Sequence, residues 1–267
     1  MTLIRKTGCQ GTTSTCQPVF LVVSQIIRTF ASNINETEDM RRTIHYILLA
    51  MGLACTTLLR AQQVAYRSFD HYNNKVAEFA PLRDIDSKTI VMLGNSLTEN
   101  GGDWAKRLAT SAKVVNRGII GDNTIGMLNR LCQITPYHPR AIFLMAGIND
   151  MSHGLPPQEV ANLVITLIDS IRRQSPTTLL LVQSILPINE STGRWKTLTG
   201  RTDDIPIANQ LIRAYCKPRG IIYIDLFRQM KSKHGNTLRP ELTTDGLHLN
   251  AKGYEVWGAE LRRYIKD

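Results

Sequence analysis

The chain has 267 residues, of which 43% are hydrophobic and 20% are charged, and its formal net charge is +10. This length suits one large domain or two small ones, and the hydrophobic content is normal for a globular core. The basic residues do not gather into runs or into stripes interleaved with aromatic side chains, which argues against nucleic acid as a partner.

The N-terminal segment has the pattern of a secretory signal. Arg41 and Arg42 precede an almost uninterrupted apolar stretch, Ile44–Leu59, and Ala61 provides a small residue for cleavage. We therefore predict a signal peptide over residues 40–61 and a protein that is exported, either periplasmic or secreted. The apolar stretch is short for a membrane span, which needs ~20 residues. We expect no stable span after cleavage, and an uncleaved anchor is the alternative.

The residues before that signal are predicted to add nothing to the fold. Met40 stands directly before the two arginines, so we interpret residues 1–39 as a leader or as the product of an upstream start. Of the five cysteines, only Cys132 and Cys216 lie beyond the signal, and no Cys or His spacing suits a metal. We expect buried thiols and neither metal nor cofactor, while a single disulfide stays open.

Residues 65–267 alternate short apolar runs with helical patterns and contain no internal repeat or linker. The predicted strands are Thr89–Leu93, Lys113–Asn116, Ala141–Met145, Leu179–Gln183 and Ile221–Asp225. The predicted helices are Tyr66–Ala80, Trp104–Thr110, Asn123–Gln133, Pro157–Gln174, Pro206–Cys216 and Ala251–Ile265. This alternation predicts one α/β domain whose five-stranded, mostly parallel sheet is covered by helices on both faces. The carboxyl ends of the strands then share one edge, where such sheets bind ligands.

Ser96 directly follows the first predicted strand and precedes the turn Gly101-Gly102. A serine in this place exposes its hydroxyl at the ligand-binding edge, beside the N–H groups that a helix start leaves without acceptors. Taken alone, the Gly-Asn-Ser-Leu-Thr segment is a weak signal, and Ser96 is better explained as a turn or capping residue.

Two further segments place hydrogen-bond donors at the same edge. Gly118 lies in the loop Asn116–Thr124, where a glycine lets a backbone N–H approach an oxyanion closely. Asn149 lies in Ala146–Asp150, after the third predicted strand, and its side-chain amide could donate to the same oxyanion. Each segment alone also fits a tight turn.

Near the C-terminus, Asp245 and His248 stand three residues apart in Asp-Gly-Leu-His. The histidine could take the proton of Ser96 while the aspartate fixes its tautomer and stabilises the imidazolium. The alternative is a structural turn at Asp245-Gly246. The sequence lacks the G-x-S-x-G elbow, because residue 98 is threonine, and this argues against an ordinary α/β-hydrolase.

Four segments of the chain resemble, in the same order, the four conserved blocks of the SGNH hydrolases, also called GDSL-type esterases and lipases. These segments are Gly-Asn-Ser-Leu-Thr, Asn-Arg-Gly, Gly-Ile-Asn-Asp and Asp-Gly-Leu-His. The resemblance runs from Ser87 to the C-terminus and implies a flavodoxin-like three-layer α/β/α sandwich. It is nearest the platelet-activating-factor acetylhydrolase-like and carbohydrate acetylesterase branch. Asn95 stands where the family name implies aspartate. The site residues that the resemblance implies are Ser96, Asp245 and His248 as the catalytic triad and Ser96, Gly118 and Asn149 as the oxyanion hole.

The reaction predicted from these residues is transfer of an acyl group from an ester to water. The long polar loop Asn189–Asp204 contains Trp195 beside basic residues, which could face a sugar ring or an anionic headgroup, although a plain surface loop fits as well. We predict a short acyl group, particularly acetyl, on a small-molecule or glycan ester. The alternatives are a lysophospholipase or thioesterase, or a carbohydrate-binding protein without activity.

Overall fold

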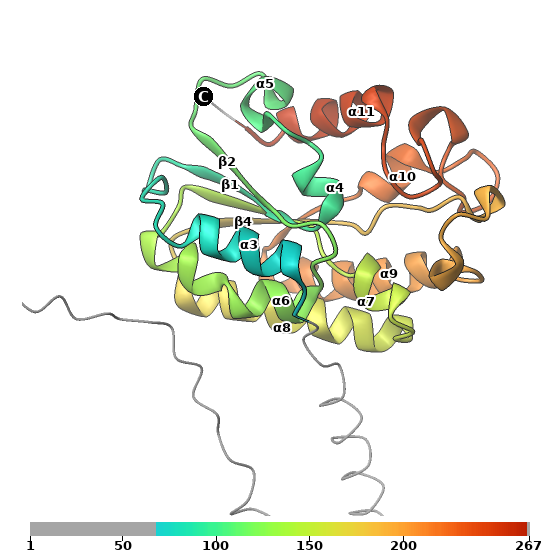
Figure 1. The fold of residues 1–267 in the computed structure, drawn as a ribbon, viewed down its shortest axis with the longest axis horizontal. Helices are drawn as coiled ribbons and strands as arrows, with labels where there is room; N and C mark the ends of the chain where they lie inside the picture. Colours follow the sequence, from blue (N-terminus) through green and yellow to red (C-terminus); the bar gives the residue numbers. More distant parts are fainter. Residues whose placement is uncertain (1–67, 266–267) are drawn as a thin grey trace, which may run out of the picture. The chain divides into compact units, whose positions relative to one another are not determined.

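The computed structural model describes residues 68–265 and contains a five-stranded sheet in which all strands are parallel, in the order β2-β1-β3-β4-β5 (Figure 1). The strands are β1 (Ile90–Gly94), β2 (Val114–Gly118), β3 (Ala141–Leu144), β4 (Leu179–Gln183) and β5 (Ile222–Ile224). The predicted α/β/α sandwich is confirmed, with a wholly parallel sheet in place of a mostly parallel one.

Helices cover both faces of the sheet (Figure 1). The layer on one face contains α3 (Asp70–Phe79), α6 (Thr124–Asn129), α7 (Ile148–Ser152), α8 (Pro157–Gln174) and α9 (Asp204–Cys216). The opposite layer contains α5 (Trp104–Leu108), α10 (Leu226–Met230) and α11 (Ala251–Arg262), and the single turn α4 (Ser96–Glu99) follows β1. The short 3-10 helices are Leu131–Gln133, Thr135–Tyr137, Glu190–Thr192, Lys196–Leu198, Lys217–Arg219 and Pro240–Leu242.

The side chains of β1 show why the sheet must be covered twice. Val91 and Leu93 pack into the core beneath α6, α8 and α9, whereas Ile90 and Met92 pack against α5 and α11. Side chains alternate between the faces of a strand, and all five residues of β1 are buried. Burying both faces stabilises the sheet by ~25 cal/mol for each Å² of apolar surface removed from water.

The strand order changes direction beside β1. The chain runs from β1 to β2 on one side and then returns to β3 on the other side, so the connections that leave β1 and β3 diverge. In open α/β sheets this divergence opens a crevice at the carboxyl ends of the strands, where ligands bind. Ser96 and Asn149 follow β1 and β3 at this edge.

The predicted elements agree with the structure to within a few residues, with two kinds of difference. The helix predicted over Asn123–Gln133 ends as α6 at Asn129 and continues as a separate 3-10 turn, because Arg130 leaves the helical region with φ −108° and ψ 7°. The helices α4, α7 and α10 were not predicted, since four or five residues are too few to show a 3.6-residue period. Trp104 and Trp257, on α5 and α11, are fully buried between their helical layer and the sheet.

Several predictions concern the ends of the chain or its cysteines. The proposed leader over residues 1–39 and signal peptide over residues 40–61 lie outside the described residues. Within residues 68–265, no helix combines the length and the apolar character that crossing a membrane requires. Cys216 is buried, and burial raises the pKa of its thiol to about 11. Cys132 is exposed, so the expectation of two buried thiols was wrong for this residue.

Candidate active site

Ser96 is the first residue of α4, immediately after the end of β1. The Asn95 side chain caps this short helix by accepting the Leu97 N–H at 3.0 Å. Ser96 is 6% exposed, and its backbone N–H belongs to the first turn, where a helix supplies no acceptor. The hydroxyl and this N–H therefore stand together at the carboxyl edge of the sheet.

His248 joins Ser96 to Asp245. Its Nε2 lies 3.0 Å from Ser96 Oγ, and its Nδ1 lies 2.9 Å from Asp245 Oδ2. The structure thus brings together the three residues that the sequence predicted as a triad. Asp245 and His248 share one loop, which lies 149 or more residues after Ser96 in the chain. This is the geometry of a nucleophile, a base and an orienting acid.

Asp245 is held ionised by the loop that contains it. Its Oδ1 accepts the backbone N–H groups of Leu247 at 3.0 Å and His248 at 2.7 Å. Burial raises the pKa of the Asp245 carboxyl, but the hydrogen bonds from His248 and these backbone groups outweigh it and lower the pKa below its usual value. Asp245 therefore remains a carboxylate, which is the form that accepts the Nδ1 proton of His248.

Gly118, predicted as an oxyanion donor, is not available for that role. Its N–H donates to Asn116 Oδ1 at 2.9 Å, inside β2. Gly118 is a glycine for another reason: a Cβ there would lie 2.1 Å from the backbone nitrogen of Glu99, in α4. The prediction is corrected on this point, because the N–H is already bonded and the glycine serves the close approach of α4 to β2.

Gly121, three residues further along the loop, has the properties that Gly118 lacks. It is exposed, its φ is +80°, and its N–H has no hydrogen-bond acceptor within residues 68–265. The Asn149 side chain lies at the same turn, because its Nδ2 donates to the Asp122 carbonyl at 2.8 Å. The loop after β2 and the start of α7 thus place a backbone donor and an amide donor side by side.

Comparisons with known proteins identify the family of this chain. Residues 92–256 match the family model of the GDSL-like lipase/acylhydrolases. The chain belongs to this family. It is 27% identical over 203 residues to the GDSL esterase/lipase WDL1 of Oryza sativa subsp. japonica, and the match covers 66% of this chain and 77% of that protein.

Two solved structures show how far the fold is shared. A Streptococcus pneumonia protein described as a platelet activating factor superposes with a TM-score of 0.65 at 25% identity, over 82% of this chain and 99% of that one. A GDSL-like lipase from Bacteroides thetaiotaomicron gives a TM-score of 0.63 at 22% identity, over 72% of this chain and 96% of that one. As a GDSL-like acylhydrolase, the protein is a serine hydrolase of carboxylic ester bonds.

In this GDSL-like hydrolase, the loop Asn189–Asp204 packs directly on the loop that contains Asp245 and His248. Asn189 N–H donates to the Gly246 carbonyl at 2.7 Å, and Thr192 Oγ1 donates to the Asp245 carbonyl at 2.9 Å. Gly246 has φ +89°, and a Cβ on it would lie 2.3 Å from the Asn189 carbonyl oxygen. Only glycine fits this contact, so the position of Asp245 depends on the neighbouring loop.

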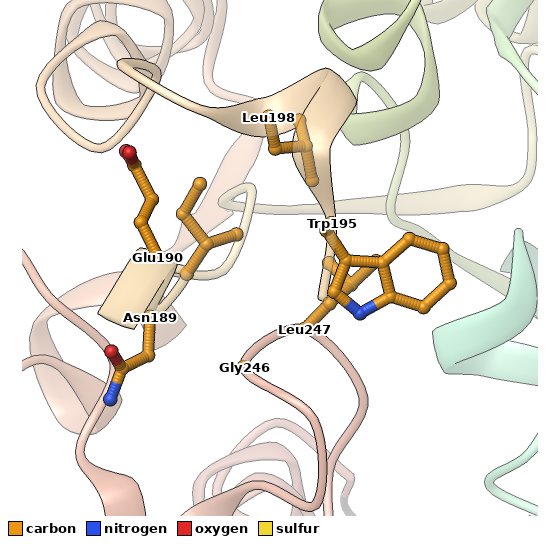
Figure 2. Close-up of a pocket in the computed structure, with 7 residues that line it drawn as sticks. Asn189, Glu190, Trp195, Leu198, Gly246 and Leu247 are labelled. Carbon is orange, nitrogen blue, oxygen red and sulfur yellow. The ribbon is translucent and has the colours of Figure 1, made fainter. Parts of the chain in front are cut away.

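Trp195 is the aromatic residue in contact with His248. Its indole meets the His248 ring edge-on, with ring centroids 5.2 Å apart and planes at 69°, and it is 37% exposed. Figure 2 shows Trp195 and Leu198 above the Gly246–Leu247 turn, with Asn189 and Glu190 across a small cavity. The Glu190 carboxylate accepts backbone N–H groups of residues 200 and 202, which fixes the loop that carries the indole.

The sequence pattern missed two buried acids and their partners near Gly121 and Asn149. Asp150 accepts the N–H and the hydroxyl of Thr124 at the start of α6, and burial raises its pKa. Asp122 pairs with Arg130, and both side chains are 1% exposed. A charged residue inside an otherwise apolar helical pattern was the available signal for Arg130.

Proposed function

We propose that this GDSL-like hydrolase is an exported esterase that removes short acyl groups, chiefly acetyl, from carbohydrate. The main observation that supports the proposed catalytic mechanism is the position of His248. Its Nε2 lies 3.0 Å from Ser96 Oγ, and its Nδ1 lies 2.9 Å from Asp245 Oδ2. These contacts support Ser96 as nucleophile, His248 as general base and Asp245 as the residue that orients the imidazole.

The proposed reaction has two halves. In the first, Ser96 Oγ attacks the ester carbonyl carbon while His248 Nε2 takes the hydroxyl proton, and the protonated imidazole then gives that proton to the departing alcohol oxygen. In the second, a water molecule attacks the acyl-serine ester with the same proton transfers, which releases the carboxylic acid and restores Ser96. The ionised Asp245 stabilises the imidazolium in both halves.

The negative oxygen of each tetrahedral intermediate needs hydrogen-bond donors. We assign this role to the backbone N–H groups of Ser96 and Gly121 and to the side-chain amide of Asn149. One amide hydrogen of Asn149 is held by the Asp122 carbonyl, which leaves the second hydrogen for the substrate. A single donor of this kind contributes about 3 kcal/mol to transition-state stabilisation.

The preference for a short acyl group follows from the surface near the triad. The large hydrophobic side chains that are exposed within residues 68–265 are scattered, and only those of Ile120 and Trp195 belong to loops that flank Ser96 and His248. A long acyl chain or a lipid surface calls for a contiguous apolar area of several hundred Å². Two separate side chains suit an acetyl group better.

The preference for carbohydrate follows from Trp195. A partly exposed indole held beside the catalytic histidine offers a flat apolar face on the leaving-group side of Ser96, and such a face can pack on a pyranose ring. Backbone N–H groups of the loop donate to the Glu190 carboxylate and to the Asn189 side-chain oxygen, and these bonds order the loop, so the indole is in place before the substrate binds. The basic residues Arg194 and Lys196 flank it.

The proposal is tested by two measurements on the same preparations. Ser96→Ala should abolish hydrolysis of p-nitrophenyl acetate without changing the melting temperature, whereas Ser111→Ala, at an exposed serine before β2, should leave activity unchanged. Wild-type protein should release acetate from acetylated oligosaccharides faster than it cleaves p-nitrophenyl esters of eight or more carbons. Retained activity in Ser96→Ala would refute the nucleophile assignment, and a preference for long chains would refute the substrate class.

Two alternatives become outcomes of these assays. A lysophospholipase or thioesterase would cleave lysophospholipid or acyl thioester substrates better than acetylated glycans, with the same dependence on Ser96. A carbohydrate-binding protein without activity would bind the glycans and cleave none of the esters. The hydrogen bonds that join the complete triad favour the enzyme over the binding protein.

Export is proposed on the signal pattern of residues 40–61. Expression of the full chain in a secreting host and sequencing of the released protein should give an N-terminus at Gln62. A released protein that begins before Met40 would overturn both the signal assignment and the interpretation of residues 1–39.

A further inference from the structure

We propose that Arg130 and Asp122 form a positioning pair that holds the oxyanion donors in their catalytic arrangement. This inference rests on the proposed function, because it names what keeps the Gly121 and Asn149 donors in place. Neither residue touches the substrate under this proposal. Both act through the backbone groups and the amide that they fix.

The ion pair is buried as deeply as any part of the core. Arg130 Nε donates to Asp122 Oδ2 at 2.9 Å, and each side chain is 1% exposed. Removing two charges from water costs several kcal/mol per ion, so such a pair gives little net stability compared with apolar side chains of the same size. Because stability does not explain this buried ion pair, its contacts with neighbouring groups indicate its role.

The guanidinium reaches the strand that carries the nucleophile. Arg130 Nη2 donates to the Gly94 carbonyl at 3.1 Å, two residues before Ser96. The same carbonyl accepts the N–H of Ile119, in the loop after β2, at 3.1 Å. Arg130 thus joins the end of β1 to the loop that contains Gly121.

Asp122 reaches the two oxyanion donors. Its N–H donates to the Ile119 carbonyl at 3.1 Å, which closes the turn around Gly121, and its own carbonyl accepts Asn149 Nδ2 at 2.8 Å. Its carboxylate is fixed by Arg130, so one side chain sets the turn and the amide together. Gly126 makes room for it, because a Cβ there would lie 1.9 Å from Asp122 Oδ1.

The charge on Asp122 depends on its partner. Burial raises the pKa of the Asp122 carboxyl to about 6, while the Arg130 guanidinium opposes that rise. Lysine in place of arginine keeps the positive charge but loses the planar fork that contacts Asp122 and Gly94 at the same time. Arg130→Lys is therefore the variant that separates charge from geometry.

The first test compares Arg130→Lys with a control of similar burial. Thr135 is 1% exposed, and its hydroxyl bonds the Leu131 carbonyl and Gln174, before β3 at the opposite edge of the sheet. We expect Arg130→Lys to lower kcat on p-nitrophenyl acetate by about ten- to a hundredfold with KM nearly unchanged, because misplacement by ~1 Å has effects of this size. Thr135→Val should lower the melting temperature and leave kcat unchanged.

The second test asks whether Arg130 acts through the oxyanion donors. Phenylboronic acid forms a tetrahedral adduct on serine, so its inhibition constant should rise in Arg130→Lys by the same factor as kcat/KM falls. In an Asn149→Ala background, Arg130→Lys should cost clearly less than it costs in the wild type, because part of its effect has already been removed.

The outcomes separate the inference from the function on which it rests. If wild-type protein cleaves esters but Arg130→Lys keeps its kcat, or shifts the boronate constant and kcat independently, the positioning role is wrong. If Arg130→Lys does not fold, Asp122→Asn tests the pair from its other side: it removes the carboxylate charge, keeps the backbone carbonyl that Asn149 contacts, and should likewise lower kcat with KM nearly unchanged. If Ser96→Ala remains active, the proposed function fails whatever Arg130 does.

Discussion

Replacing Asp245 by asparagine removes one negative charge and leaves the shape of the side chain almost unchanged. In the structure, Oδ1 accepts the backbone N–H groups of Leu247 at 3.0 Å and His248 at 2.7 Å, and Oδ2 accepts from His248 Nδ1 at 2.9 Å. An asparagine preserves both backbone hydrogen bonds only if its oxygen stays at the Oδ1 position. Its NH₂ group then faces His248 Nδ1, which must become an acceptor.

That exchange places the imidazole proton on Nε2, the nitrogen that faces Ser96 Oγ. A protonated Nε2 cannot take the hydroxyl proton, so the nucleophile is no longer activated. The same change in the triad of a serine protease lowers kcat about 10⁴-fold. At about 1.36 kcal/mol for each factor of ten, this corresponds to ~5.5 kcal/mol of activation free energy. We expect Asp245→Asn to show a loss of this size.

The assay is steady-state hydrolysis of p-nitrophenyl acetate together with a thermal melt of each variant. Asp225→Asn is the matched control: Asp225 caps α10 by accepting the Arg228 N–H at 3.1 Å, and asparagine caps helices equally well. The control should keep its activity, and the melt should show that Asp245→Asn is still folded at the assay temperature. If Asp245→Asn retained about a tenth or more of the wild-type kcat, the tautomer argument would be refuted.

The remaining predictions concern the groups around the triad. Asn149→Ala should lower kcat about 10²- to 10³-fold with KM nearly unchanged; a loss of less than about tenfold in the same assay would remove its amide from the oxyanion hole. Trp195→Ala should raise KM for acetylated oligosaccharides and leave KM for p-nitrophenyl acetate unchanged. An equal rise for both substrates would contradict packing of a sugar ring on the indole. Gly246→Ala should reduce the free energy of unfolding in urea by more than about 1 kcal/mol, because φ is +89° and the Asn189 carbonyl leaves no room; an unchanged midpoint would contradict this. The lowered pKa of Asp245 contributes stability that is present above its unfolded pKa and is lost as pH falls through the folded value. Asp245→Asn should therefore lose less stability than the wild type below pH ~4, and parallel acid unfolding curves would count against this.

The sheet could be predicted well from the sequence because each buried parallel strand is a distinct run of apolar residues. Each strand is a short apolar run, such as Leu179–Gln183, bounded by turn residues, and α8 shows its apolar face in full over Pro157–Gln174. The rule that parallel strands share one carboxyl edge then gathered Ser96, Asn149 and the Asp245-x-x-His248 loop into one site. The local pattern and the topology rule were sufficient for these residues.

The sequence could not identify which glycine of the loop after β2 is the one we assign to the oxyanion hole. Gly118 and Gly121 stand three residues apart in one loop, and their difference lies in hydrogen bonds and backbone angles rather than in sequence. The Arg130–Asp122 pair and the contact of Trp195 with His248 depend on side chains brought together by the packing of separate segments. No period or spacing records such contacts, so only the folded arrangement shows them.

The central claim is that Ser96, activated by His248, is the nucleophile of an ester hydrolase. The most direct test is to treat the full-length protein with a fluorophosphonate probe and to locate the adduct by mass spectrometry of its peptides. The claim predicts a single adduct on Ser96, loss of esterase activity in proportion to labelling, and no adduct in Ser96→Ala. An adduct on another serine, or full activity after Ser96 is labelled, would contradict it.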